Sequence, residues 1–159
     1  MILVTLGTHN MPMNRLLVEL DRLVGSGVIT DEVIVQTAVL DYRPDHLAVR
    51  PILPYPELVD LVTKADVVVS HAGPGNLATV RNAGKVPVVV PRVARLGEHV
   101  DDHQERYARR LAEVPGYVVV VDVSELGVAI AAARAIRVQI RKPDISAAIA
   151  ILEEIIGCD

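Results

Sequence analysis

The chain has 159 residues, of which 51% are hydrophobic and 23% charged, a balance typical of one globular domain. Its 16 basic and 20 acidic residues give a net charge of −4, which argues against general nucleic-acid binding because that needs a basic face. Phe and Trp are absent, so no aromatic platform for stacking single-stranded bases is expected. The single cysteine, Cys158, excludes an internal disulfide and a zinc site with several cysteines.

No targeting or membrane-spanning segment is expected from the sequence. The N-terminal run MILVTLG has no basic stretch before it and is too short for a signal-peptide core. The most apolar later stretch, residues 128–140, contains Arg134 and Arg137, and no window approaches the roughly 18 to 20 apolar residues of a membrane helix. We therefore expect a soluble, cytoplasmic protein.

Short apolar runs typical of strands alternate with segments of helical periodicity. A strand over residues 1–6 ends at Gly7, and a helix begins at Pro12 and ends at Gly25. Further strands are expected over residues 32–37, 47–53 (weaker, because Pro51 lies inside it), 67–70, 87–90 and 117–121. Further helices are expected from Pro56, over residues 76–83 and 102–111, from Ser124, and over residues 144–156.

This alternation predicts βαβ units with right-handed crossovers, and therefore an α/β fold with a doubly wound, Rossmann-like parallel sheet covered on both faces. Residues 1–159 are expected to form a single domain that includes the C-terminal helices from about residue 124. Ligands of such sheets bind beyond the carboxyl ends of the strands. The loops over residues 7–11, 71–76 and 91–102 are therefore the ones expected to form a site.

The second of these loops is rich in glycine and leads directly into a helix. In the segment VVVSHAGPGNLATV, a strand runs into Gly73-Pro74-Gly75. Free N–H groups at a helix start attract anions, and glycines let a phosphate approach the backbone. The spacing matches neither the Walker A pattern nor GxGxxG, so a tight turn without a ligand stays an alternative. His71 either contacts a ligand or hydrogen-bonds the loop, and for a lone histidine we favour the second.

The first loop, Gly7-Thr8-His9-Asn10, also joins a strand to a helix. Its small and polar residues can present N–H groups and a hydroxyl to an anion. Asn10 can equally cap the helix that follows, and capping is compatible with binding. Two such loops facing one crevice favour a diphosphate ligand.

The third loop contains GEHVDDHQ, in which Asp102 and Gln104 could bind adjacent sugar hydroxyls. His99 and His103 are four residues apart, so a metal site is the rival interpretation. That spacing suits a metal only if both histidines are helical, and the HExxH order is absent, so we expect no metal here. A solvated first helical turn, with Asp101 and Asp102 beside the helix dipole, explains the aspartates but not the histidines.

Taken together, SHAGPGN, GKVPVVVPR and GEHVDDHQ resemble the glycosyltransferase family 28 C-terminal domain. ILVTLGTH and EVIVQT resemble its short stand-alone version, the donor-binding subunit of two-part UDP-sugar glycosyltransferases of exopolysaccharide and lipid-linked GlcNAc synthesis. The resemblance extends from Met1 to about Val123. It implies one half of a GT-B enzyme, with the nucleotide-sugar against the carboxyl edge of the sheet.

The resemblance also implies roles for particular residues. Gly7 and Thr8 would face the diphosphate, and backbone groups around Tyr55 would meet uracil. Phosphate would lie against the helix start, and the donor sugar against the third loop. The residues implied there are Gly73, Gly75 and Asn76 for phosphate, and Asp102 and Gln104 for sugar hydroxyls.

Three positions depart from the family pattern. Thr79 stands where the family usually has a Glu that holds the ribose hydroxyls, and a Thr hydroxyl cannot form the charge-assisted bidentate pair. Asn76 replaces a commoner Ser, and Ala38 stands where a Gly is usual. The Thr79 departure favours the rival interpretation, a non-catalytic scaffold subunit that has lost nucleotide binding. A nicotinamide enzyme on the same fold is excluded because GxGxxG is absent.

The resemblance further implies a membrane-associated partner subunit that binds a polyprenyl-linked glycan acceptor and supplies the catalytic base. No catalytic residue is then expected in this chain, and no cofactor or metal, with a UDP-sugar as substrate and recruitment to the inner face of the membrane. Two features near the C-terminus could dock the partner, although core packing and a solvated surface are the blander interpretations. They are an apolar stripe, Ile145, Ile149, Leu152 and Ile156, and a basic cluster, Arg134, Arg137, Arg141 and Lys142.

Overall fold

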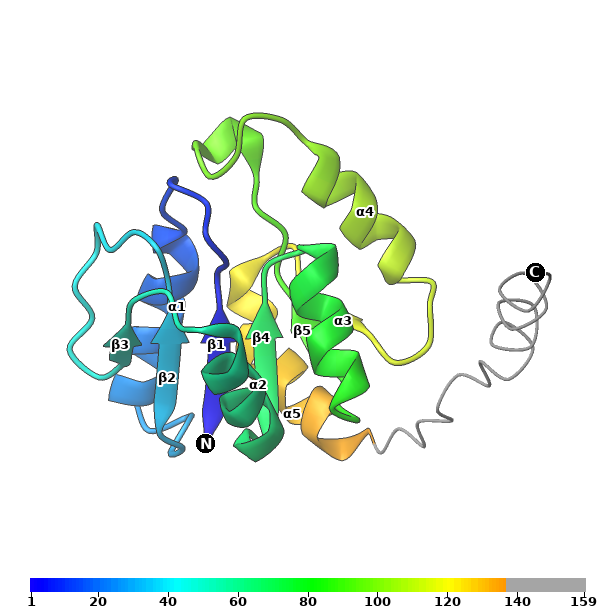
Figure 1. Ribbon diagram of the computed structural model, residues 1–159. Coiled ribbons are helices and arrows are strands. Elements are labelled where there is room, and N and C mark those ends of the chain that lie inside the picture. Colours follow the sequence, from blue (N-terminus) through cyan, green and yellow to red (C-terminus); the bar gives the residue numbers. More distant parts are fainter. Residues whose placement is uncertain (137–159) are drawn as a thin grey trace, which may run out of the picture.

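The computed structural model describes residues 1–136, which form alternating strands and helices (Figure 1). The expected helix over residues 144–156, its apolar stripe, and the basic residues beyond Arg134 lie outside the described residues. The strands are β1 (Ile2–Thr5), β2 (Val33–Gln36), β3 (Ala48–Arg50), β4 (Val67–Ser70), β5 (Pro87–Val89) and β6 (Val118–Val119). The helices are α1 (Asn14–Gly25), α2 (Tyr55–Lys64), α3 (Pro74–Asn82), α4 (His103–Leu111) and α5 (Leu126–Ala135).

All six strands belong to one sheet in the order β3-β2-β1-β4-β5-β6, and every neighbouring pair is parallel. The predicted doubly wound α/β fold is therefore confirmed. The strand order reverses between β1 and β4, so the loops that follow these two strands diverge. Such a switch point leaves a crevice at the carboxyl edge of the sheet.

Helices cover both faces of the sheet, with α2 and α3 in front and α1 and α5 behind in Figure 1. Side chains of a strand alternate between faces. Ile2 and Val4 therefore pack in the large apolar core that includes residues of α1 and α5, whereas Leu3 packs with residues of α2 and α3. A third cluster joins Ala108 and Leu111 of α4 to Val89.

The ends of several elements differ from the sequence prediction for local reasons. The first helix begins at Asn14 rather than at Pro12, because Leu16 N–H donates to the Met13 carbonyl and starts the helical ladder there. Helix α3 begins at Pro74, two residues earlier than expected, since proline lacks the N–H that a first helical residue leaves unused. A 3₁₀ turn, Val123–Glu125, precedes α5, and the Asp122 carboxylate accepts from Ser124 N–H at its start.

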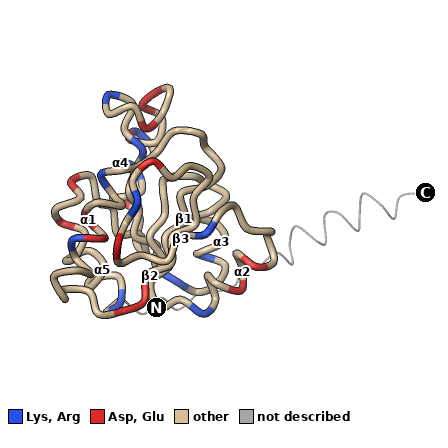
Figure 2. The backbone as a smooth tube through the Cα atoms, turned by 90° about the vertical axis from the view of Figure 1, so that its left-hand side faces the viewer, with Lys and Arg blue, Asp and Glu red and all other residues tan. Residues whose placement is uncertain are grey.

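The structure shows how charged positions and apolar helices are distributed over the described residues. Acidic and basic positions lie interspersed in the view of Figure 2. Within residues 1–136, no helix is long and apolar enough to cross a membrane. The apolar helix α5 has ten residues, about 15 Å of rise against a hydrocarbon core of about 30 Å.

Candidate functional site

The carboxyl ends of the central strands carry a row of buried polar side chains on one face of the sheet. Thr5 at the end of β1 lies in register with Gln36 of β2 on one side and Ser70 of β4 on the other. The Thr5 hydroxyl donates to Ser70 Oγ at 3.0 Å, and the Ser70 hydroxyl donates to the His71 carbonyl at 3.0 Å. The sequence analysis missed Thr5 and Ser70, although a polar residue closing an apolar strand was a usable signal.

Asn76 extends this chain of hydrogen bonds to helix α3. Its side-chain amide donates to Thr5 Oγ1 at 3.2 Å. The side chain of Asn76 therefore points inward and ties the first turn of α3 to the end of β1. We expected Asn76 to bind phosphate, and this hydrogen bond leaves its backbone N–H as the group that faces outward from the helix start.

His71 joins the two glycine-bearing loops. The ring Nδ1–H donates to the Thr5 carbonyl oxygen at 3.2 Å, because a carbonyl can only accept. A Cβ added to Gly7 would lie 2.7 Å from this ring, and one added to Gly73 only 2.3 Å. The loop after β1 and the loop after β4 therefore both pack against one imidazole, and Gly7 adopts a positive φ of 71° there.

The electrostatic setting of His71 keeps its imidazole neutral at physiological pH. Burial lowers the pKa of His71 to about 4, and the nearby positive charge of Arg92 acts in the same direction. The hydrogen bond to Thr5 opposes this shift but is the smaller effect. With Nδ1 protonated, Nε2 carries the lone pair, so His71 hydrogen-bonds the loop in the way that we favoured for a lone histidine.

The start of α3 presents backbone donors to open space. Pro74 has no N–H, and the Gly73 N–H donates to the His71 carbonyl at 2.8 Å. Within the described chain, the N–H groups of Gly75 and Asn76 have no hydrogen-bond acceptor. Gly75 is exposed, and a Cβ added to it would meet nothing within 4 Å. The geometry suits an anion, because the helix dipole adds a partial positive charge at this end.

Other predicted site residues lie at the same edge but are not joined to this centre. Thr8 is exposed, and Tyr55, 65% exposed, is the first residue of α2. Over residues 1–136, no hydrogen bond links either residue to the loop after β4. Thr79 lies one turn into α3, and its hydroxyl donates to the Gly75 carbonyl at 3.0 Å. That hydroxyl can therefore only accept from a ligand unless it first releases its intrahelical bond.

A buried arginine fixes the third loop against the first. Arg92 is 1% exposed, and its guanidinium donates to the carbonyls of Leu6 (2.8 Å), Met11 (2.6 Å) and Glu98 (3.1 Å). Burial lowers its pKa, but an arginine stays charged. The sequence analysis missed this role of Arg92, because the three carbonyls come from two loops that are distant in the sequence.

Glu98 and Gln104 complete the same network from inside the third loop. The buried Glu98 carboxylate accepts from Val93 N–H at 2.9 Å and pairs with Arg15 at 2.9 Å. Gln104 is also buried, and its Oε1 accepts from Arg92 N–H at 3.2 Å. Because Oε1 is engaged by Arg92, the Gln104 amide could make the expected sugar contact only through its Nε2 donors.

Asp102 and His103 lie on the exposed side of this loop, whereas the side chain of His99 is 9% exposed. Asp102 precedes α4, and its carboxylate is 3.4 Å from Arg106. The His99 ring lies between those of His9 and His103, with centroid distances of 4.6 and 4.5 Å. Burial lowers the pKa of His9, and the charge of Arg92 adds to that effect.

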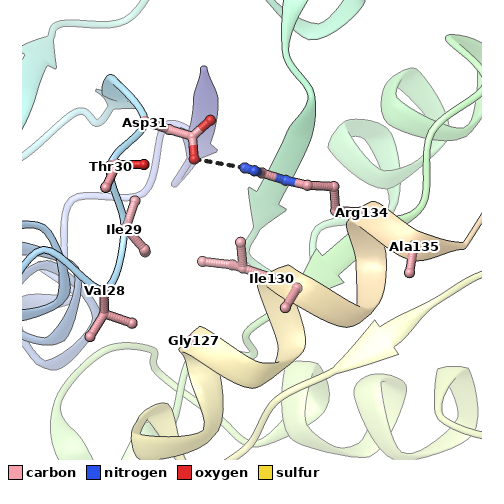
Figure 3. A pocket seen from close by; sticks show the side chains of 9 residues that line it. Val28, Ile29, Thr30, Asp31, Gly127, Ile130, Arg134 and Ala135 are labelled. Carbon is pink, nitrogen blue, oxygen red and sulfur yellow. Dashed lines mark hydrogen bonds and ion pairs between the residues drawn. The ribbon is translucent and has the colours of Figure 1, made fainter.

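A largely apolar pocket lies at the opposite edge of the sheet (Figure 3). This pocket of about 360 Å³ lies between residues 28–31, before β2, and the face of α5 that carries Gly127 and Ile130. The Arg134 guanidinium closes one side by pairing with Asp31 at 2.8 Å, which lowers the pKa of Asp31. None of the residues predicted to bind the nucleotide-sugar lines this pocket, although Arg134 belongs to the basic cluster that could dock a partner.

Comparisons with known proteins identify relatives by sequence and by fold. A UDP-N-acetylglucosamine transferase subunit, ALG13, of Cryptococcus neoformans var. neoformans serotype D is 43% identical over 67 residues, which are 42% of this chain and 32% of the relative. The chain thus spans about a third of the curated relatives it matches. The glycotransferase of kitacinnamycin superposes with a TM-score of 0.61, at 18% identity, over 96% of this chain and 38% of that chain.

A second solved structure, the spinosyn forosaminyltransferase SpnP, has a TM-score of 0.57 at 19% identity over 98% of this chain and 43% of that chain. These likenesses show the fold, a Rossmann-like half of a GT-B glycosyltransferase. The model of the glycosyltransferase family 28 C-terminal domain matches residues 1–128, which include all three loops at the carboxyl edge. The chain therefore belongs to the glycosyltransferase family 28 C-terminal domain family.

Proposed function

We propose that this chain is the donor-binding subunit of a UDP-sugar-dependent glycosyltransferase. The observation that carries the proposal is the open start of α3, where the N–H groups of Gly75 and Asn76 have no acceptor within the described chain and a Cβ on Gly75 would meet nothing within 4 Å. A diphosphate there would receive backbone hydrogen bonds and the helix dipole together. Membership of the family and the relative named as a UDP-N-acetylglucosamine transferase subunit support the same assignment.

In this proposal, the chain contributes electrostatic stabilisation of the leaving diphosphate. The negative charge that develops on the diphosphate as the sugar leaves would be held by fixed N–H donors, which need no reorganisation during the reaction. The network around Arg92 would keep the first and third loops in place, and Asp102 and the Gln104 amide would bind sugar hydroxyls. The catalytic base would come from the partner.

The partner in this proposal is a membrane-associated subunit that binds a polyprenyl-linked glycan, and this glycan is the acceptor of the transferred hexose or N-acetylhexosamine. It would recruit this chain to the cytoplasmic face of the membrane. A hetero-oligomer of this kind, in exopolysaccharide or lipid-linked glycan synthesis, is supported by the word subunit in the name of the ALG13 relative.

Calorimetric titration with UDP, in EDTA, tests the proposal directly. We expect weak binding by the isolated chain and tighter binding once the partner is added, because a second domain closes the crevice. UDP should also raise the melting temperature, since a ligand that binds only the native state stabilises it. The proposal would be overturned if millimolar UDP, with the partner present, gave no heat of binding and no thermal shift.

A second candidate function rests on one specific contact. The Thr79 hydroxyl donates to the Gly75 carbonyl instead of pointing free toward a ribose. Together with the missing carboxylate at this position, the contact favours a scaffold subunit without nucleotide binding. The negative result of the titration above would promote this candidate.

A further inference from the structure

The exposed side of the third loop brings three metal-ligating side chains together. The nitrogen and oxygen ligand atoms of His99, Asp101 and His103 all lie within 4.8 Å of one another. His99 Nδ1 is 3.4 Å from Asp101 Oδ1, and His103 Nδ1 is in hydrogen-bonding contact with the same oxygen. We call these three residues the His-Asp-His cluster.

One of these separations, between His99 and Asp101, already suits a shared cation. In a tetrahedral site with bonds of 2.0–2.1 Å, two ligand atoms lie about 3.3 Å apart. The distance of 3.4 Å between His99 and Asp101 needs almost no adjustment to reach that value. His99 Nδ1 accepts from the Asp101 N–H at 3.3 Å, so its one lone pair would exchange this hydrogen bond for the ion.

The fold also removes the reason for which the spacing alone argued against a metal. Two histidines four residues apart were expected to meet an ion only if both were helical. His103 is the first residue of α4, whereas His99 lies in the loop before it, and the turn between them places Asp101 in the middle. The loop conformation, rather than a helix face, makes the three side chains converge.

Charge and access around the cluster are compatible with a bound cation. The side chains of Asp101 and His103 are 54% and 49% exposed, so an ion and its water ligands can reach them, whereas the His99 side chain is 9% exposed and would bind the ion from the protein side. Two carboxylates, Asp101 and the neighbouring Asp102, offset the positive end of the α4 dipole. The His9 ring packs on His99 and connects the cluster to the loop after β1.

We propose that the His-Asp-His cluster binds one divalent transition-metal ion of the Zn²⁺ type. Two imidazoles and one carboxylate suit Zn²⁺, Co²⁺ or Ni²⁺, whereas Mg²⁺ prefers oxygen ligands alone. Three protein ligands leave the fourth position for water. The ion would fix the third loop at the carboxyl edge. This inference goes beyond the proposed function and holds with or without nucleotide binding.

Metal titrations of the full chain, prepared without a histidine tag, test the proposal. Calorimetry with Zn²⁺ and visible absorption with Co²⁺ should both show one ion per chain, and Mg²⁺ should give no heat. Asp101→Asn and His103→Ala should each weaken Zn²⁺ binding at least tenfold, since even loss of a residue supporting a ligand costs about 10- to 100-fold. Both side chains are exposed, so the variants should melt like the parent.

Asp102→Asn is the matched control, because it removes the same charge one residue away from the cluster. It should change Zn²⁺ affinity by less than about threefold, as expected for an exposed charge screened by water and salt. Absence of saturable one-to-one binding would overturn the proposal. Equal binding by the parent, Asp101→Asn and His103→Ala would also overturn it, and a Cys158→Ser variant would then show whether the thiol holds the ion.

Discussion

The imidazole of His71 occupies the space that a Cβ on Gly73 would need: such a carbon would stand 2.3 Å from His71 Nε2. A Cβ added to Gly7 would likewise stand 2.7 Å from the same ring. Two glycines that were assigned to phosphate binding are thus also required by a histidine that holds the loops after β1 and β4 together. Gly75, in contrast, faces open space.

This difference predicts opposite results for two glycine substitutions. Gly73→Ala should lower the free energy of unfolding by about 1–3 kcal/mol, because the His71 ring must shift. Gly75→Ala should leave stability unchanged or raise it, since alanine is the better helix former. Urea denaturation of both variants measures this, and equal stabilities would contradict the packing described for His71.

Gly75→Val extends the comparison to ligand binding. The fold should survive, because Gly75 is not among the glycines with positive φ and its Cβ position is open. A branched side chain there would stand where a phosphate approaches the N–H groups, so UDP binding should be lost. A folded Gly75→Val chain that binds UDP like the parent would move the phosphate site elsewhere.

The low pKa of His71 predicts a specific acid sensitivity. The folded pKa is about 4, below the ordinary value of 6.5, so the unfolded chain binds the extra proton between these values. The stability that neutral His71 contributes is therefore complete above about pH 6.5 and is lost as the pH falls toward about 4. His71→Asn keeps an N–H donor that does not titrate, and its unfolding free energy should fall less steeply over this range.

The control for this prediction is His46→Asn, a substitution of a half-exposed histidine far from the crevice. His71 is unchanged in this variant, so the stability that neutral His71 contributes should still be lost between about pH 6.5 and 4. If His71→Asn and the parent lose stability in parallel over this interval, then His71 is not held neutral by the fold.

Arg92 is expected to be the most sensitive single residue at the carboxyl edge. Arg92→Leu would leave the buried carbonyls of Leu6, Met11 and Glu98 without their charged donor. Hydrogen bonds to charged groups are worth about 1.5–3 kcal/mol each, so a loss of about 3 kcal/mol or more is expected. Arg95→Leu, at an exposed position three residues later, should cost less than about 0.5 kcal/mol. Similar losses for both variants in chemical denaturation would refute this role.

Thr79→Glu tests whether α3 meets a ribose. A carboxylate in place of the hydroxyl offers a charged acceptor, worth about 1.5–3 kcal/mol against 0.5–1.5 kcal/mol for a neutral one. UDP should bind roughly tenfold more tightly, since about 1.4 kcal/mol is a factor of ten. The free energy gained from the ribose hydrogen bonds should exceed two costs. The carboxylate must be desolvated, and it must lie near a diphosphate that is also negatively charged.

The 2′-deoxy analogue of UDP supplies the control for this substitution. It lacks one of the two hydroxyls, so Thr79→Glu should improve its binding much less. Unchanged or weaker UDP binding by a well-folded variant would mean that this helix does not contact the ribose. Thr79→Val removes the intrahelical bond to Gly75 without adding charge, and it separates the effect of that bond from the effect of the carboxylate.

Over residues 1–136, the sequence by itself determined the strand and helix order, the parallel doubly wound sheet and the edge at which the loops gather. It could do so because buried parallel strands read as short apolar runs, and because proline and glycine mark helix ends within a few residues. The motifs around Gly73-Pro74-Gly75 and Glu98–Gln104 also indicated the family, which the family model confirms over residues 1–128.

Only the tertiary structure decided which polar groups meet. Arg92 gathers carbonyls from two loops more than 80 residues apart in sequence, and Thr5 finds Ser70 and Asn76 across the switch between β1 and β4. The spacing of His99 and His103 argued against a metal, yet the loop before α4 makes their side chains converge on Asp101. Local patterns determine hydrophobic periodicity, whereas such contacts depend on strand register and loop path, which only the packed chain fixes.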